Sequence, residues 1–356
     1  MNSKIDVLLT GASGTVGSEV LQQLAQLKNI NLTIFDQKSV KSKRIFALYK
    51  NHINVIYGDL TNEKDVATIP DKLDIVIHLA AIIPPLADEK PELTRKVNVI
   101  GTKTLLNRLE MNSPNVFFMY SSSISVYGDR VLNPFIRTTD ILLPSLGDIY
   151  AQTKIESENL IKKSKLNWTI FRLAAIMKNH KVSRLMFHMP LSTTLEICTP
   201  SDTARAFITG IYKKEELIGH VFNLGGGEKC CTSYEKFLEK SFQIFGLGTL
   251  NFPDLAFANQ NFHCGYYEDG NKLEEILHFR SDTLKTYYDQ TRKSIPLTTR
   301  ILCFTFRGII KKFLLIQSEP YNSVRKNNKS LMVQFFGKTG YTFTGISVNN
   351  KIKSAI

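Results

Sequence analysis

The chain has 356 residues, 43% of them hydrophobic and 22% charged, which is the composition of a soluble globular protein with a full core. No apolar run is long enough to span a bilayer, and a strand pattern begins so early that a signal peptide has no room. Ten units of the formal net charge of +13 fall in residues 271–356, with 15 Lys and Arg against 5 Asp and Glu. This uneven charge argues against a nucleic-acid-binding protein. The five cysteines lack metal-site spacing, so we expect no metal and reduced thiols in a cytoplasmic protein.

The first element is an apolar strand at residues 7–10 that runs into a turn with three glycines. A helical pattern follows, so the turn presents unpaired backbone N–H groups and the positive end of a helix dipole to an anion. Gly11 permits the tight turn, Gly14 lets the backbone approach a pyrophosphate, and Gly17 lets the helix pack closely on the sheet. We therefore predict a dinucleotide site with contacts from Gly11, Ser13, Gly14, Thr15, Val16 and Gly17.

The second strand, residues 31–36, ends in an acid, Asp36, that lies about twenty residues beyond the glycine turn. An acid at that distance caps the adenosine ribose hydroxyls, which favours NAD over its 2′-phosphorylated form, NADP. Four cations follow the strand and could hold a 2′-phosphate or form a solvated helix face: Lys38, Lys41, Lys43 and Arg44.

The next two strands, residues 53–57 and 73–81, end in candidate cofactor contacts. Asp59 follows the third strand, beside Leu60, and could meet the adenine amino group or cap the next helix. Ala80 and Ala81 end the fourth strand and would let a flat cofactor lie against the backbone. His78 is interpreted as a hydrogen-bonded core histidine.

A long helix after Pro91 and a fifth strand at residues 116–120 continue the alternation of strands and helices. This rhythm predicts an α/β fold with a doubly wound parallel sheet, in which ligands bind at the carboxyl ends of the strands.

The fifth strand runs into Ser121, Ser122 and Ser123, and a helical pattern from Tyr150 to Lys163 follows a loop. Tyr150 and Lys154 are four residues apart, so they lie on one face of that helix. An ammonium close to a phenol favours the phenolate, so we expect Lys154 to lower the pKa of Tyr150. Tyr150 could then act as a general acid or base, with a serine hydroxyl holding the substrate oxygen.

These motifs together resemble the extended short-chain dehydrogenase/reductase superfamily, and within it the NAD-dependent epimerase/dehydratase group. The resemblance covers residues 4–290 and rests on Thr10-Gly11-x-x-Gly14-x-x-Gly17, His78-Leu79-Ala80-Ala81, Asn98-x-x-Gly101-Thr102, Ser121 to Ser123 with Val126-Tyr127-Gly128, and Tyr150-x-x-x-Lys154. It implies a Rossmann-type sheet with a smaller C-terminal substrate lobe, and a catalytic triad of Ser123, Tyr150 and Lys154. It also implies adenosine contacts from Asp36 and Asp59, a nicotinamide ribose contact from Lys154, a cofactor contact from Asn98, and a homodimer formed through helices that include the Tyr150 helix.

Two departures from the family pattern narrow the chemistry. Related 4,6-dehydratases follow the catalytic hydroxyl with Asp-Glu, and decarboxylases place a glutamate two residues after it, whereas this chain has Ile124 and Ser125. Neither side chain titrates, so dehydration and decarboxylation are disfavoured. Many nucleotide-sugar members follow the sixth strand with Asn and Gly, whereas this chain has Ala174 and Ala175, and an apolar wall suits a less polar substrate such as a sterol-like or acyl ketone.

We expect a cofactor domain in residues 1–175, a substrate lobe interleaved with the end of the sheet in residues 176–296, and a basic extension in residues 297–356. In the lobe, the pattern predicts a helix from Pro200 capped by Ser201, a capping box at Thr232-x-x-Glu235, and helices at residues 273–277 and 281–293. Arg205 could meet a phosphate or form a surface salt bridge.

Residues 299–316 mix large apolar side chains with cations and contain no acid, which is typical of a basic amphipathic helix. Residues 297–316 could therefore contact the inner face of a membrane peripherally, or pack on the protein or on a second subunit. Beyond them, residues 321–330 are predicted to be a polar loop and residues 331–341 a short hairpin.

The sequence therefore predicts an NAD(P)-dependent oxidoreductase that moves a hydride at a secondary alcohol or ketone of a small molecule, with Tyr150 as acid or base. Two alternatives remain open. One is a nucleotide-sugar epimerase with tightly bound NAD, and the other is a non-catalytic NAD(P)-binding sensor.

Overall fold

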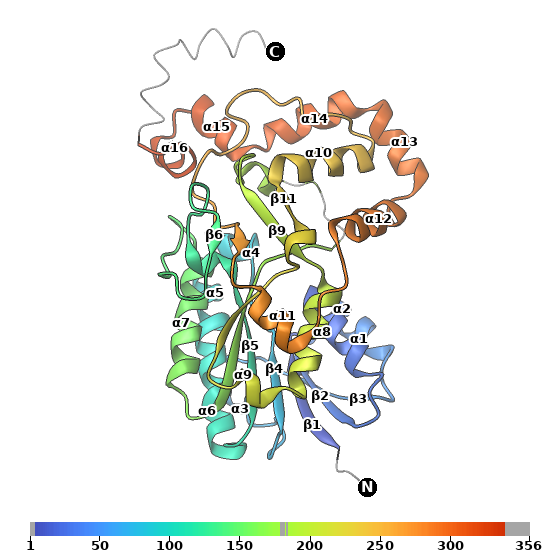
Figure 1. Ribbon diagram of the computed structural model, residues 1–356, viewed down its shortest axis with the longest axis vertical. Coiled ribbons are helices and arrows are strands. Elements are labelled where there is room, and N and C mark those ends of the chain that lie inside the picture. Colours follow the sequence, from blue (N-terminus) through green and yellow to red (C-terminus); the bar gives the residue numbers. More distant parts are fainter. Residues whose placement is uncertain (1–3, 179–181, 183, 339–356) are drawn as a thin grey trace.

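The computed structural model describes residues 4–178, 182 and 184–338, and its centre is a seven-stranded parallel sheet (Figure 1). Its order is β10-β7-β5-β4-β1-β2-β3. The strands are β1 (Ile5–Thr10), β2 (Ile30–Asp36), β3 (Ile53–Tyr57), β4 (Ile75–His78), β5 (Phe117–Ser123), β7 (Asn167–Leu173) and β10 (Val221–Leu224). The predicted doubly wound Rossmann-type sheet is confirmed, and the carboxyl ends of all seven strands meet at one edge.

Helices cover both faces of this sheet because alternate residues of each strand point to opposite sides. Val7 and Leu9 join one core cluster, whereas Leu8 joins the other. The first cluster is closed by α1 (Thr15–Leu24), α2 (Val40–Ala47), α8 (Pro200–Ile211) and α11 (Asn271–Leu277). The second is closed by α3 (Glu63–Val66), α6 (Thr102–Asn112) and α7 (Ile149–Lys163).

The helix predicted after Pro91 is not uniform. After the short α4 (Leu86–Glu89), the chain forms α5 (Pro91–Arg95), a π-helix (Lys96–Gly101) and then α6. A π-helical turn frees backbone carbonyls from the regular ladder, and such turns are often found at functional sites. Here the carbonyl of Asn98 accepts hydrogen bonds from the Thr102 and Ser157 hydroxyls, at 2.6 and 2.9 Å.

A smaller lobe stands on the carboxyl-end side of the sheet (Figure 1). Its three-stranded sheet has the order β11-β9-β8, and its core is rich in phenylalanine, including Phe187, Phe237 and Phe242. The elements of the lobe are β8 (Ala175–Ile176), β9 (Thr194–Cys198), β11 (Cys231–Ser233), α10 (Tyr234–Phe245) and α12 (Leu284–Ser294), with β6 (Phe135–Ile136) paired to β12 (Tyr266–Tyr267) beside it. The short α9 (Lys214–Leu217) belongs to the main sheet instead, because Leu217 is buried in its first core cluster.

Two predicted helix caps are wrong by one or two residues. Thr199, not Ser201, caps α8, because its side chain accepts the backbone N–H of Asp202. Ser233, not Thr232, caps α10, because Thr232 lies within β11 and pairs with β9. In both cases a neighbouring hydroxyl competes for the cap, and the tertiary position of the chain decides between them.

The described part of the C-terminal region consists of helices joined by short turns. It forms α13 (Leu297–Thr305), α14 (Arg307–Ile316), α15 (Glu319–Arg325) and α16 (Lys329–Phe336). The predicted polar loop and hairpin are therefore wrong within residues 321–338, and the end of the hairpin lies outside the described residues. Ser318 and Asn328 cap the last two helices, and α16 buries Phe335 and Phe336 against Ala258. Among the described residues, no helix has the length and apolarity needed to cross a membrane.

Replacing Gly17 with alanine is expected to destabilise the fold. A Cβ at this position would lie 2.1 Å from the carbonyl oxygen of Gly11, so the turn would have to open. We expect the free energy of unfolding to fall by about 1–3 kcal/mol, measured by urea denaturation. The matched control is Gly308→Ala in α14, where a Cβ meets nothing within 4 Å and the fold should be unaffected or slightly stabilised. Equal behaviour of the two variants would contradict the packing argument.

Candidate active site

The three residues predicted to be catalytic lie together where β5 ends beside the first turn of α7. Ser123 is the last residue of β5, and Tyr150 hydrogen-bonds its side chain. The carboxylate of Asp148 caps α7 by accepting the backbone N–H of Ala151 at 2.8 Å. The ammonium of Lys154 lies 5.7 Å from the centre of the Tyr150 ring. A serine, a tyrosine and a lysine therefore converge at the carboxyl end of a central strand.

Lys154 is buried and makes its closest contact with the sheet. Its Nζ donates a hydrogen bond to the carbonyl of Ser121 at 2.6 Å and lies 4.6 Å from the centre of the Tyr120 ring. Burial lowers the pKa of Lys154 to about 7, against the opposing charge of Glu158. This lysine is therefore a group whose charge changes close to neutral pH.

The expected effect of Lys154 on Tyr150 is corrected by the structure. Burial raises the pKa of the Tyr150 phenol, the hydrogen bond from Ser123 opposes that rise, and the charge of Asp148 adds to it. Lys154 does not hold this pKa down, because its Nζ is directed at the Ser121 carbonyl. Tyr150 therefore carries its proton at neutral pH and is placed to donate it.

Ser123 is held in turn by Ser125, one of the two residues that depart from the family pattern. The Ser125 hydroxyl donates to the Ser123 hydroxyl oxygen at 3.0 Å, and the Ser125 backbone N–H reaches the same oxygen at 3.2 Å. Ile124 between them is buried in a small apolar cluster. These contacts fix the Ser123 side chain without adding a titratable group.

The inner face of α7 is polar, and we call Thr153, Lys154, Ser157 and Glu158 its polar seam. All four side chains are buried, and each has a partner. Thr153 accepts the side-chain amide of Asn98 at 3.1 Å, and Ser157 donates to the Asn98 carbonyl. Because every member is hydrogen-bonded, the seam fixes how far along the sheet α7 can lie.

Glu158 forms a buried ion pair with Arg172 of β7, which sequence reasoning missed. Two hydrogen bonds join them, Nε to Oε1 at 3.0 Å and Nη2 to Oε2 at 2.7 Å. Ser122 donates to the same carboxylate at 2.6 Å, and Arg172 also donates to the Tyr127 hydroxyl at 2.8 Å. Although burial alone would raise it, these contacts hold the pKa of Glu158 below its usual value. The residues are 14 apart and in different elements, so no local pattern indicates the pair.

The glycine turn is built to hold a dinucleotide. Gly11 has a φ of +71°, and a Cβ there would lie 2.6 Å from the backbone nitrogen of Ala80. Gly14 is the N-cap of α1, and among the described residues no side chain caps this helix end. Asp36 lies beside the turn and accepts the backbone N–H of Ser13 at 2.8 Å. The open helix terminus and the adjacent acid fit the pyrophosphate and ribose of NAD.

The other predicted cofactor residues lie at different depths. Asp59 accepts the backbone N–H of Thr61 at 2.8 Å, and Leu60 is buried beneath it. Ala80 and Ala81 are half-buried at the end of β4, as are Val16 and Ser13 in the turn, whereas Thr15 is exposed.

Asn98 is directed into the protein. Its side chain exchanges hydrogen bonds with both backbone groups of Ile82 and with Thr153, so the structure supports a positioning role for it. His78 is the predicted core histidine: it is hydrogen-bonded to Thr10 and Thr102, and burial and Lys154 lower its pKa to about 3.

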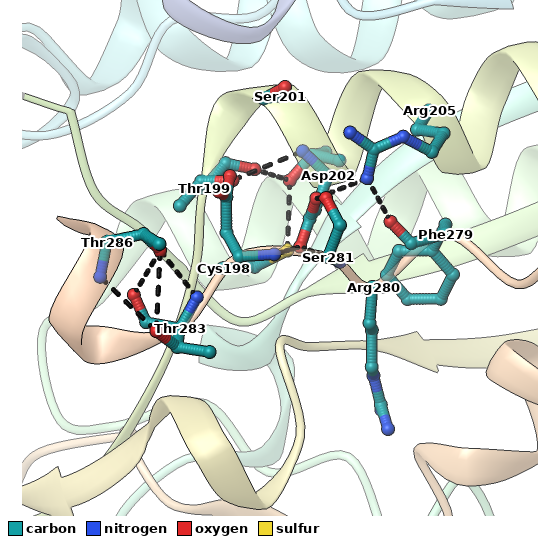
Figure 2. A network of polar contacts seen from close by, with 12 residues as sticks. Cys198, Thr199, Ser201, Asp202, Arg205, Phe279, Arg280, Ser281, Thr283 and Thr286 are labelled. Atoms are coloured by element: carbon teal, nitrogen blue, oxygen red, sulfur yellow. Dashed lines mark hydrogen bonds and ion pairs between the residues drawn. The ribbon is translucent and has the colours of Figure 1, made fainter. Parts of the chain in front are cut away.

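Figure 2 shows that the amino end of α8 is joined to the chain after α11. Buried Asp202 accepts the backbone N–H groups of Ser281 and Asp282 at 3.0 and 2.9 Å. Arg205 pairs with Asp202 and donates to the carbonyl of Phe279, so the salt-bridge interpretation of Arg205 is confirmed. This arginine is therefore occupied by the protein itself.

Comparisons with known proteins assign this chain to a family. Residues 7–190 match the NAD dependent epimerase/dehydratase family. The chain is 29% identical over 166 residues to a 3-beta-hydroxysteroid dehydrogenase of Mycolicibacterium neoaurum, covering 44% of this chain and 42% of that protein. It is 33% identical over 166 residues to UDP-glucuronate 4-epimerase 1 of Arabidopsis thaliana, covering 44% and 38%. The matches therefore span less than half of either relative.

The fold is also shared with proteins of known structure. The UDP-glucuronic acid 4-epimerase from Bacillus cereus, in complex with UDP-glucuronic acid and NAD, superposes with a TM-score of 0.68 at 21% identity, over 82% of this chain and all of that one. The protein is thus an α/β protein of the extended short-chain dehydrogenase/reductase type. It belongs to the NAD dependent epimerase/dehydratase family, which agrees with the cofactor that the sequence predicts.

The buried lysine should make stability depend on pH. Between its pKa of about 7 in the folded chain and its ordinary value of 10.5, unfolded Lys154 keeps a proton that folded Lys154 releases. Stability therefore rises with pH in this window, by up to about 1.4 kcal/mol per pH unit. We expect Lys154→Met to flatten that slope in urea titrations between pH 7 and 9, and Lys162→Met on the same helix to keep it. An unchanged slope in Lys154→Met would contradict the assignment.

Breaking the buried ion pair should be costly. Arg172→Met leaves the Glu158 carboxylate buried without its main partner, which is expected to cost about 3–5 kcal/mol of stability by urea denaturation. Lys162→Met removes the partly exposed third partner of the same carboxylate, at 3.2 Å, and should cost less than about 1 kcal/mol. A similar loss in both variants would show that burial does not set the strength of this contact.

Proposed function

We propose that this chain is an NAD-dependent oxidoreductase that interconverts a secondary alcohol and a ketone of a small molecule. The observation that carries the proposal is the cluster of Ser123, Tyr150 and Lys154 at the carboxyl end of β5, beside a turn suited to a dinucleotide. Ser123 and Tyr150 bind the substrate oxygen, and NAD on the glycine turn supplies the hydride acceptor or donor. Lys154 would contribute a positive charge at the back of this site and would contact the nicotinamide ribose, as the family resemblance implies.

Proton movement follows from the state of Tyr150. Because burial raises its pKa, the phenol is protonated at neutral pH and donates to the oxygen of a ketone during reduction. In the oxidation direction the alcohol gives up its hydroxyl proton, and the Tyr150 phenol oxygen can accept it only after losing its own proton, so that direction is favoured as the pH rises. Ser125 keeps the Ser123 hydroxyl oxygen in place during both directions.

A dehydratase is the less favoured reaction although the relatives include dTDP-glucose 4,6-dehydratase of Mycolicibacterium smegmatis, which is 27% identical over 161 residues. Elimination of water needs an additional acid and base next to the catalytic hydroxyl. Ile124 is buried and Ser125 is bound to Ser123, so neither supplies one. The same residues disfavour decarboxylation.

A nucleotide-sugar epimerase with tightly bound NAD is the second candidate, and the epimerases among the relatives favour it. Ala174 and Ala175 follow β7 where many nucleotide-sugar members have Asn and Gly, and this apolar pair favours a less polar substrate. A non-catalytic NAD(P)-binding sensor is the third, and the retained Tyr150 and Lys154 weigh against it. NADP is less favoured than NAD because Asp36 stands beside the turn.

We further propose that the chain divides at residues 175 and 296 into cofactor domain, substrate lobe and C-terminal extension, and that it works in the cytoplasm as a homodimer. The dimer would use α6 and α7, which pack together on one face of the sheet. Exposed Leu93, Ile100 and Met111 lie on that side of the molecule, on α5, the π-helix and α6.

Tyr150→Phe is expected to lower turnover by about 10²- to 10⁴-fold while leaving NAD binding intact, because only the phenolic proton is lost. The rate is followed as NADH absorbance with a panel of secondary alcohols and ketones, and NAD binding by calorimetry. Tyr212→Phe, which alters an exposed tyrosine bonded to Asn29, is the matched control and should retain full activity. Full activity of Tyr150→Phe would refute the mechanism.

The same preparation separates the two enzyme candidates. Net appearance or loss of NADH during turnover supports oxidoreduction. Protein that retains NAD through purification and converts nucleotide sugars with no net NADH signal would support the epimerase. Binding of NAD with no turnover of either substrate class would support the sensor.

A further inference from the structure

The C-terminal helices α13 and α14 present an apolar face that the fold does not use. Their inner side packs on the smaller lobe: Leu314 is buried in its core, and Cys303 and Ile310 are partly buried against it. The outer side carries two stripes at helical spacing, Leu297, Ile301 and Phe304 on α13 and Ile309, Phe313 and Ile316 on α14. These six side chains are each between 56% and 68% exposed.

All charged side chains of α13 and α14 are positive. Residues 297–316 contain four Lys and Arg and no Asp or Glu. Arg307 lies over the ring of Phe304, 4.6 Å from its centre, and Lys312 is exposed beside the α14 stripe, three residues from Ile309 and four from Ile316. Cations therefore flank the apolar stripes on the outward side.

We propose that α13 and α14 form a lipid-docking face, which lies in the plane of an anionic membrane surface with its apolar stripes inserted. Apolar and aromatic side chains flanked by cations are what such a surface binds, since the acyl boundary takes the stripes and anionic headgroups take the charges. A second copy of this face would instead bring cations against cations with no acid from the segment to pair with them. The ten residues of α14 are too short to cross a bilayer, so the contact is peripheral.

The position of the face permits docking without closing the site. In Figure 1, α13 and α14 form the end of the molecule furthest from the N-terminal ends of the sheet strands, outside α10. The face is fixed rigidly to the lobe, because Lys311 donates to the carbonyl of Thr249 and Ser318 to that of Ala256, at 2.6 and 2.7 Å. Docking would therefore hold the whole enzyme at the membrane, whatever its substrate.

The test is flotation of the full chain with vesicles of phosphatidylcholine alone or mixed about three to one with phosphatidylglycerol. We expect binding to the anionic vesicles, weakened by salt and by removal of phosphatidylglycerol. The double variant Ile309→Glu with Phe313→Glu should bind at least about tenfold more weakly.

The matched control is Leu132→Glu with Ile141→Glu, which changes the net charge equally at side chains that are 96% and 83% exposed and lie elsewhere. It should bind like the unmodified chain. Circular dichroism and NAD binding establish that both variants are folded, and they keep this test independent of the catalytic proposal.

Three outcomes would overturn the proposal: no flotation of the unmodified chain, equal weakening in both double variants, or binding that does not depend on phosphatidylglycerol. Loss of a dimer in Ile309→Glu with Phe313→Glu, seen by light scattering without any vesicle binding, would assign the face to a second copy instead.

Discussion

The position of the candidate active site depends on how the hydrogen-bonding groups of the polar seam of α7 are paired. A helix normally packs on a sheet through apolar side chains, but here Thr153, Lys154, Ser157 and Glu158 are buried in the contact. Each must find a partner, since an unpaired buried polar group costs about 1–3 kcal/mol and a charged group more. The partners come from β5, β7 and the π-helix, so α7 can rest at only one height along the sheet. That height sets Tyr150 against Ser123.

The π-helix and the ion pair therefore help to fix the geometry of the candidate active site. The π-helical turn frees the carbonyl of Asn98 for Ser157, and the Asn98 amide joins α7 to the loop after β4. Arg172 neutralises Glu158, whose negative charge opposes the burial-driven fall in the pKa of Lys154. A change at β7 can thus alter the protonation of Lys154 through one intermediate carboxylate.

Features that depend on residues close together in the chain could be predicted from the sequence, whereas features that depend on contacts between distant elements could not. The glycine turn and the four-residue spacing of Tyr150 and Lys154 are local patterns. The first correctly predicted a strand, a turn and a helix, and the second correctly predicted that the two side chains lie on one face of a helix. The direction of the Lys154 ammonium is not local, because it depends on the carbonyl of Ser121 on another strand, and so the expected effect on Tyr150 failed. The Glu158–Arg172 pair joins a helix to a strand, so no local sequence pattern indicates it. In the C-terminal region, polar composition suggested a loop, but capping by Ser318 and burial of Phe335 stabilise helices.

The C-terminal helices show why amphipathicity alone did not describe this segment. The pattern predicted one helix, whereas the chain forms two. Phe306 lies between them, as the C-cap of α13 and the N-cap of α14. This break lets Leu314 reach the lobe while Arg300 packs its backbone against Gly246, where a Cβ would lie 2.5 Å from the Arg300 carbonyl oxygen. One side of the segment is consequently committed to the fold. The stripes on the other side contribute nothing to that packing, so their apolar character needs a different physical cause, which the proposed contact with lipid would supply.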